Sequence, residues 1–79
     1  MSSIRTGYAL EKWVWNDIYN EYYPYYDWYD TWEEVYPIFF SFKPDMDNSQ
    51  MSIYTAEMDK YGQWKLLDLI EYKDAADEA

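Results

Sequence analysis

The sequence predicts an α+β domain in which N-terminal helical segments pack on a small three-stranded antiparallel sheet. Apolar side chains with helical spacing occupy the first third of the chain, and short aromatic or alternating segments follow Pro37. The length of 79 residues allows one domain, 1–79, in which we expect residues 1–7 and 74–79 to be frayed.

The first helix is expected to start after Gly7 and to end near Pro24. One set of residues follows the spacing of a helical face: Leu10, Trp13, Val14, Asp17, Ile18, Glu21 and Tyr22. A second flank is rich in tyrosine and holds more aromatic surface than one core stripe needs. The stretch 25–29 that follows is ambiguous.

A second, short helix is expected around residues 31–36. Asp30 or Thr31 could cap its start, and Glu33 and Glu34 would then lie in the first turn, where negative charge is favoured. We expect Pro37 to end this helix.

Three strands are expected beyond Pro37. Gly62 can adopt the positive φ of the turn before the third strand. The segments are Ile38–Phe42, Met51–Glu57 and Trp64–Tyr72. The third segment is also compatible with a helix, but the compact turn at 59–63 favours a strand.

The composition excludes several classes of function. The chain has 16 Asp and Glu against six Lys and Arg, a formal net charge of −10, and neither His nor Cys. It therefore lacks a thiol nucleophile, a Ser-His-Asp triad and a cysteine zinc site. The charge also disfavours direct nucleic-acid binding, because phosphate affinity comes from Lys and Arg.

Carboxylate chemistry is the remaining route to an enzyme or a metal protein. Two carboxylates could in principle hydrolyse a glycoside, but 79 residues leave little room for a substrate cleft. Asp45, Asp47 and Asn48 resemble the start of a calcium loop, yet the Gly and the twelfth-position Glu of that loop are missing. A hairpin loop explains these residues better, so we expect no catalytic residues, no cofactor and no metal.

The stretch from Trp13 to Phe42 contains no Lys or Arg, but holds six acids and 14 of the 19 aromatic residues. If residues 27–34 are helical, then Asp27, Asp30 and Glu34 share one face. Nothing basic nearby offsets these charges, and their repulsion costs stability. The acids are either solvated helix faces that give solubility or a surface for a partner. We favour a partner-binding surface composed of Asp17, Glu21, Asp27, Asp30, Glu33, Glu34, Tyr23 and Tyr26.

Very small, strongly acidic, Tyr- and Trp-rich chains without His or Cys resemble bacteriophage inhibitors of host nucleic-acid machinery. Anti-CRISPR proteins, anti-restriction DNA mimics and uracil-DNA glycosylase inhibitors are examples. The resemblance lies in composition and is greatest between Trp13 and Tyr36. It implies a non-catalytic DNA mimic that occludes the basic nucleic-acid-binding site of a host defence complex, with a CRISPR-Cas effector as the favoured target.

The alternative is an antitoxin or adaptor that binds a basic protein through an aromatic patch without mimicking DNA. In both cases the partner is a host protein, and the chain does not bind nucleic acid directly. An exposed aromatic patch could also serve as the interface of a homodimer. The N-terminus lacks the apolar run of a signal peptide, and no stretch is apolar enough to span a membrane. We therefore expect a soluble protein in the cytoplasm of the bacterial host cell.

Overall fold

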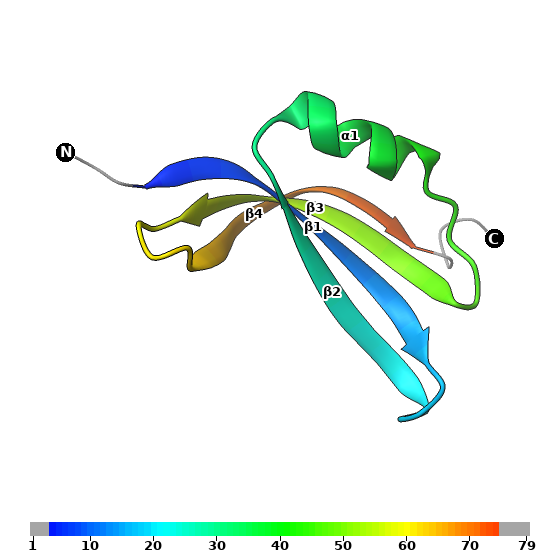
Figure 1. Cartoon of the computed structure of the whole chain (residues 1–79). Coiled ribbons are helices and arrows are strands. Elements are labelled where there is room, and N and C mark those ends of the chain that lie inside the picture. Colours follow the sequence, from blue (N-terminus) through cyan, green and yellow to red (C-terminus); the bar gives the residue numbers. More distant parts are fainter. Residues whose placement is uncertain (1–3, 75–79) are drawn as a thin grey trace.

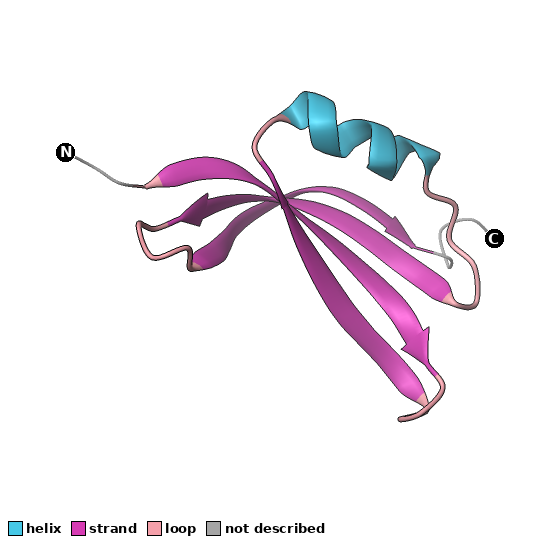
Figure 2. Cartoon of the chain, in the orientation of Figure 1, coloured by secondary structure: helices cyan, strands magenta, loops and turns pink. Residues whose placement is uncertain are grey.

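A computed structural model describes residues 4–74 and shows one antiparallel sheet with a helix on one side (Figures 1 and 2). The strand order is β2-β1-β3-β4, so β2 and β4 are the edges. The elements along the chain are β1 (Arg5–Asn16), β2 (Glu21–Tyr29), α1 (Trp32–Ser41), β3 (Asn48–Met58) and β4 (Trp64–Asp74). The predicted three-stranded sheet with N-terminal helical segments is therefore wrong.

The expected first helix is a β-hairpin, β1–β2. Side chains cover both faces of β1, so its apolar residues do not alternate simply with polar ones as in a half-exposed strand. Trp, Val and Tyr also favour strands, and this preference outweighs the helical spacing of the apolar residues. In the turn, the Asn16 side-chain oxygen accepts the amides of Ile18 and Tyr19 at 2.9 and 3.1 Å, and Asn20 has a φ of 57°. The ambiguous stretch 25–29 belongs to β2, whose Pro24 is tolerated because β2 is an edge strand.

The second helix exists as α1, and of the two predicted caps, Asp30 and Thr31, the structure uses Thr31. Thr31 Oγ1 accepts the Glu34 amide at 3.3 Å, and the Glu34 carboxylate accepts the Thr31 amide at 3.2 Å. Pro37 does not end this helix but lies inside it, so the predicted strand Ile38–Phe42 is wrong. Val35 and Phe39 lie one turn apart and both bury against the sheet, which outweighs the hydrogen bond that Pro37 cannot donate.

The C-terminal half follows the prediction more closely. Met51–Glu57 lies within β3, and 64–72 is a strand rather than a helix. Gly62 has the positive φ expected of the turn, 82°. The pairing of β3 with β4 shifts twice, and at one of these bulges Thr55 Oγ1 accepts the Asp68 amide at 3.0 Å.

The main core lies between α1 and the sheet. It consists of Leu10, Val35, Phe39, Met51 and Ile53, with partly buried aromatic residues around it. At the C-terminal end of α1, Lys73 of β4 donates hydrogen bonds from Nζ to the carbonyls of Phe39, Phe40 and Phe42, at 2.7, 3.1 and 3.2 Å. The Phe39 carbonyl also accepts the Phe42 amide at 3.1 Å, so the cation adds a second donor there and supplies donors to Phe40 and Phe42 at the end of the helix.

On the other side of the sheet, large side chains from the edge strands lie over small residues of the central strands. The rings of Trp28 on β2 and Trp64 on β4 meet edge-on, with centroids 5.6 Å apart. Ala9 and Ala56 beneath are 0 and 1% exposed. A Cβ on Gly7 would lie 2.6 Å from Trp28 Cζ2, so only glycine fits there. These large side chains bury the small residues of the central strands on this side, where no helix covers the sheet.

Candidate partner-binding surfaces

Five exposed acids lie along the β2 edge of the molecule, which we call the acidic edge. They come from the β1–β2 turn, from β2 and from the first turn of α1, and are Asp17, Glu21, Asp27, Glu33 and Glu34. Glu21 and Asp27 point to the same side of β2 and are six residues apart, or roughly 20 Å along the strand. All five belong to the partner-binding residues that the sequence predicted.

The structure brings members of the acidic edge close to tyrosines. Burial first, and then the negative charges of Asp27 and Glu34, raise the pKa of Tyr29 above its ordinary value. Near the hairpin turn, a hydrogen bond with Glu21 is the main cause of a raised pKa at Tyr23. The predicted Tyr23 therefore does lie beside an acid of this edge.

The predicted common helix face of Asp27, Asp30 and Glu34 is wrong, because residues 21–29 form a strand. Asp30 follows that strand and is already engaged. Its carboxylate accepts hydrogen bonds from the Trp28 indole, at 2.9 Å, and from the Arg5 guanidinium. These two contacts hold the pKa of Asp30 below its ordinary value. Asp30 thus carries less free charge toward a partner than its neighbours do.

The ion pairs within residues 4–74 join Arg5 to Asp30 and Lys65 to Glu57. Neither uses a member of the acidic edge. Lys12 faces the same side of the sheet but is half-buried on β1, next to the core residue Met51 of β3. Within residues 4–74, the carboxylates of the acidic edge are therefore not neutralised by an ion pair.

Tyr26 was predicted beside the acids but points to the opposite side of the sheet. Its hydroxyl donates a 2.6 Å hydrogen bond to the carboxylate of Glu11, its cross-strand neighbour. This bond is the main cause that raises the pKa of Tyr26 to about 12. Glu11 is 7% exposed. Sequence reasoning missed Glu11, because only the register of β1 against β2 shows that a tyrosine hydroxyl covers it.

The side of the sheet opposite α1 is the second candidate surface, which we call the open aromatic face. Figure 1 shows α1 on one side of the sheet only. Cross-strand pairing places one row of large side chains on this side. The row comprises Trp13, Trp15, Tyr22, Tyr26, Trp28, Tyr54, Trp64, Leu66, Leu69 and Tyr72. This face follows from the pairing of four strands, where the sequence predicted three strands and an N-terminal helix.

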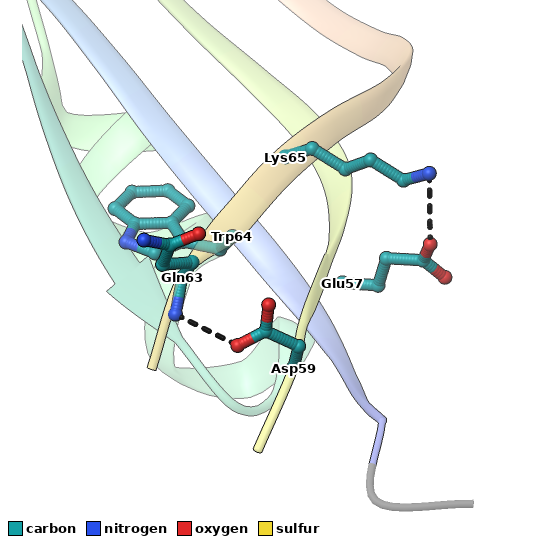
Figure 3. Close-up of a pocket in the computed structure, with 5 residues that line it drawn as sticks. All are labelled: Glu57, Asp59, Gln63, Trp64 and Lys65. Atoms are coloured by element: carbon teal, nitrogen blue, oxygen red, sulfur yellow. Dashed lines mark hydrogen bonds and ion pairs between the residues drawn. The ribbon is translucent and has the colours of Figure 1, made fainter. Parts of the chain in front are cut away.

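A polar pocket of about 300 Å³ lies at the β3–β4 turn (Figure 3). Lys65 reaches Glu57 at 3.3 Å on one side of it. The Asp59 carboxylate accepts the amides of Tyr61 and Gln63, at 2.8 and 3.1 Å. The charged groups are therefore occupied in holding the turn together, and we assign this pocket a structural role. In the described part of the chain, no acids gather in a group that could hold a metal ion.

Comparison with known protein families, curated proteins and solved structures finds no match to this chain. Within residues 4–74, the structure has no helix with the length and apolar character needed to cross a membrane.

Proposed function

We propose that this chain is a non-catalytic inhibitor that acts in a bacterial host cell by occupying a basic nucleic-acid-binding site in place of DNA. Its acidic edge makes the contact. The single observation that carries the proposal is the arrangement of Asp17, Glu21, Asp27, Glu33 and Glu34 as exposed carboxylates that form no ion pair with any residue of 4–74.

Electrostatics supplies the mechanism. A groove lined by Lys and Arg attracts a surface of opposite charge over a long range, which speeds association and excludes the competing polyanion. The five carboxylates are sparser than the phosphates of a duplex, which carries one charge per roughly 1.7 Å of axis. The inhibitor therefore competes for the basic residues without reproducing the double helix.

Short-range affinity needs apolar contact as well. Ile18 and Tyr19 lie at the tip of the hairpin between Asp17 and Glu21, and both side chains are largely exposed, at 86 and 66%. The Asn16 side chain fixes the backbone of this tip. An apolar tip flanked by acids suits a groove in which basic residues surround an apolar spot.

The test is capture of the host target. The immobilised protein is exposed to bacterial lysate, and bound proteins are eluted with a salt gradient, with and without added duplex DNA. We expect a nucleic-acid-binding complex that elutes as salt rises and that DNA displaces. Reconstituted CRISPR-Cas effectors are the first purified targets to assay for DNA binding, because of the resemblance in composition to phage inhibitors.

Two outcomes would contradict the proposal. A partner that remains bound at high salt and ignores DNA would show that binding does not rest on the acidic edge. A partner whose DNA binding continues undisturbed in the complex would show that the nucleic-acid site is not occupied.

A further inference from the structure

The open aromatic face leaves large apolar side chains in contact with water. Five of them are more than a third exposed: Tyr22 at 38%, Tyr26 at 41%, Leu66 at 37%, Leu69 at 53% and Tyr72 at 45%. Cross-strand pairing places all of them on the same side of the sheet, away from α1. Contiguous apolar patches of this kind mark interaction sites in soluble proteins.

We propose that a second copy of this chain covers the open aromatic face, so that two sheets pack face to face around a two-fold axis. Three features point to this occupant: the area of the face, the scarcity of charge in its interior and its self-complementary shape.

The area suffices for a stable dimer. Four strands about 4.8 Å apart, each paired over about ten residues at 3.3 Å per residue, cover roughly 600 Å². Two copies together would then bury roughly 1,200 Å², which is at the lower end of the range for stable protein interfaces. Two packed sheets lie about 10 Å apart, and their side chains interdigitate.

The charge distribution favours a copy over a basic partner. Within residues 4–74, strand pairing places three charged residues of the strands on this face: Glu11, Arg5 and Asp74. Glu11 is 7% exposed beneath Tyr26. Arg5 and Asp74 lie at the ends of β1 and β4, where Arg5 pairs with Asp30 and Asp74 accepts a hydrogen bond from Tyr72. A basic partner would therefore find little to pair with here. The acidic edge lies on the β2 rim and on the α1 side, so two copies can meet without bringing those acids into contact.

The shape of the face is suited to a two-fold contact. A hollow of about 250 Å³ lies between the edge strands and is lined by Tyr26, Trp64 and Leu66. Leu69, the most exposed of the five side chains, belongs to the same face. A two-fold interface requires both parts of each contact on one surface, and Leu69 of each copy can fill the hollow of the other.

The test is sedimentation equilibrium of the whole chain at about 10–100 µM, in low and high salt. We expect a mass near twice the 9.8 kDa of one chain. Because each chain carries a net charge of −10, salt should strengthen the dimer by screening this repulsion. Salt should instead weaken binding of the host target by the acidic edge. The two proposals therefore respond to salt in opposite directions, and the failure of one can be told from the failure of the other.

Leu69→Glu places a charge on the open aromatic face, whereas Ile38→Glu makes the same change on the exposed side of α1, where Ile38 is 39% exposed. We expect Leu69→Glu to weaken the dimer by at least about a hundredfold and Ile38→Glu to leave it intact. Near-UV circular dichroism checks that both variants fold, and Leu66→Lys is the second variant if Leu69→Glu does not. A monomeric wild type in both salts would overturn the proposal, as would a dimer that survives both face variants.

Discussion

Replacing Lys73 with methionine should destabilise the protein far more than the same replacement at Lys65. Both lysines lie on β4, and each variant raises the negative charge by one, so effects of net charge cancel in the comparison. Methionine keeps the apolar stem but removes the ammonium group. The difference between the two losses of stability therefore measures the contribution of the contacts that each ammonium group makes.

The magnitude follows from those contacts. Lys73 Nζ donates to three carbonyls at the end of α1 and lies 4.7 Å from the centre of the Phe39 ring. Hydrogen bonds to a charged group contribute about 1.5–3 kcal/mol, and a carbonyl left without a donor adds to the loss. We expect Lys73→Met to lower the free energy of unfolding by about 2–3 kcal/mol. Lys65 makes one ion pair with Glu57 and its side chain is 70% exposed, so its loss should be below about 1 kcal/mol.

Urea denaturation followed by circular dichroism measures both losses. Thermal melting should show the same order, with a drop of about 10–20 °C for Lys73→Met, since 1 kcal/mol corresponds to roughly 4–8 °C in a chain of this size. Equal losses in the two variants would refute the reasoning, because the carbonyls of α1 would then not depend on Lys73.

Two further predictions concern the open aromatic face. Gly7→Ala should cost about 1–3 kcal/mol and reduce the near-UV circular dichroism of Trp28 and Trp64, because the new Cβ would lie 2.6 Å from Trp28 and from the Tyr29 carbonyl oxygen. Gly62→Asn is its control, because a Cβ added there meets no other atom within 4 Å and any loss comes from the backbone φ of 82°, which Asn tolerates better than most residues. An equal loss of the near-UV signal in this control would contradict the packing argument. The pKa of Tyr26 is raised from 10.0 to about 12, so the folded state holds this proton more tightly than the unfolded state. This contribution to stability is complete below pH 10 and is lost as the pH rises toward 12. Urea midpoints between these pH values should fall less steeply in Tyr26→Phe than in the wild type, and parallel curves would show that the bond to Glu11 does not control this titration.

The sequence predicted correctly those features that depend on residues close together in the chain. The Thr31 cap and the Gly62 turn could be predicted because a hydroxyl at a helix start and a glycine at a positive φ act over three or four residues. The hairpin β1–β2 was missed although Asn16 and Asn20 flank its turn. Leu10 and Trp13 match helical spacing by chance, because one packs under α1 and the other faces the opposite side.

The candidate surfaces depend on contacts between residues far apart in the chain, and the spacing of residues along the sequence does not predict such contacts. Asp30 is bonded to Arg5, 25 positions away, so no local pattern could show that it is engaged. The side to which Tyr26 points follows from the strand register, since a shift of one residue reverses every side chain. That Glu21 and Asp27 form no ion pair within residues 4–74 agrees with the sequence, in which no Lys or Arg lies between Trp13 and Phe42. Their role in binding a partner stays a prediction.

The most direct test of the acidic edge compares two double variants that both change the net charge from −10 to −8. Glu21→Gln with Asp27→Asn neutralises the β2 edge, and Asp68→Asn with Glu71→Gln neutralises β4. The measurement is the affinity for the captured host complex over a range of salt concentrations. We predict that the β2 variant binds at least about tenfold more weakly at low salt and with a flatter salt dependence, while the β4 variant binds like the wild type. Equal behaviour of the two variants would contradict the proposal, because net charge rather than the acidic edge would then account for binding.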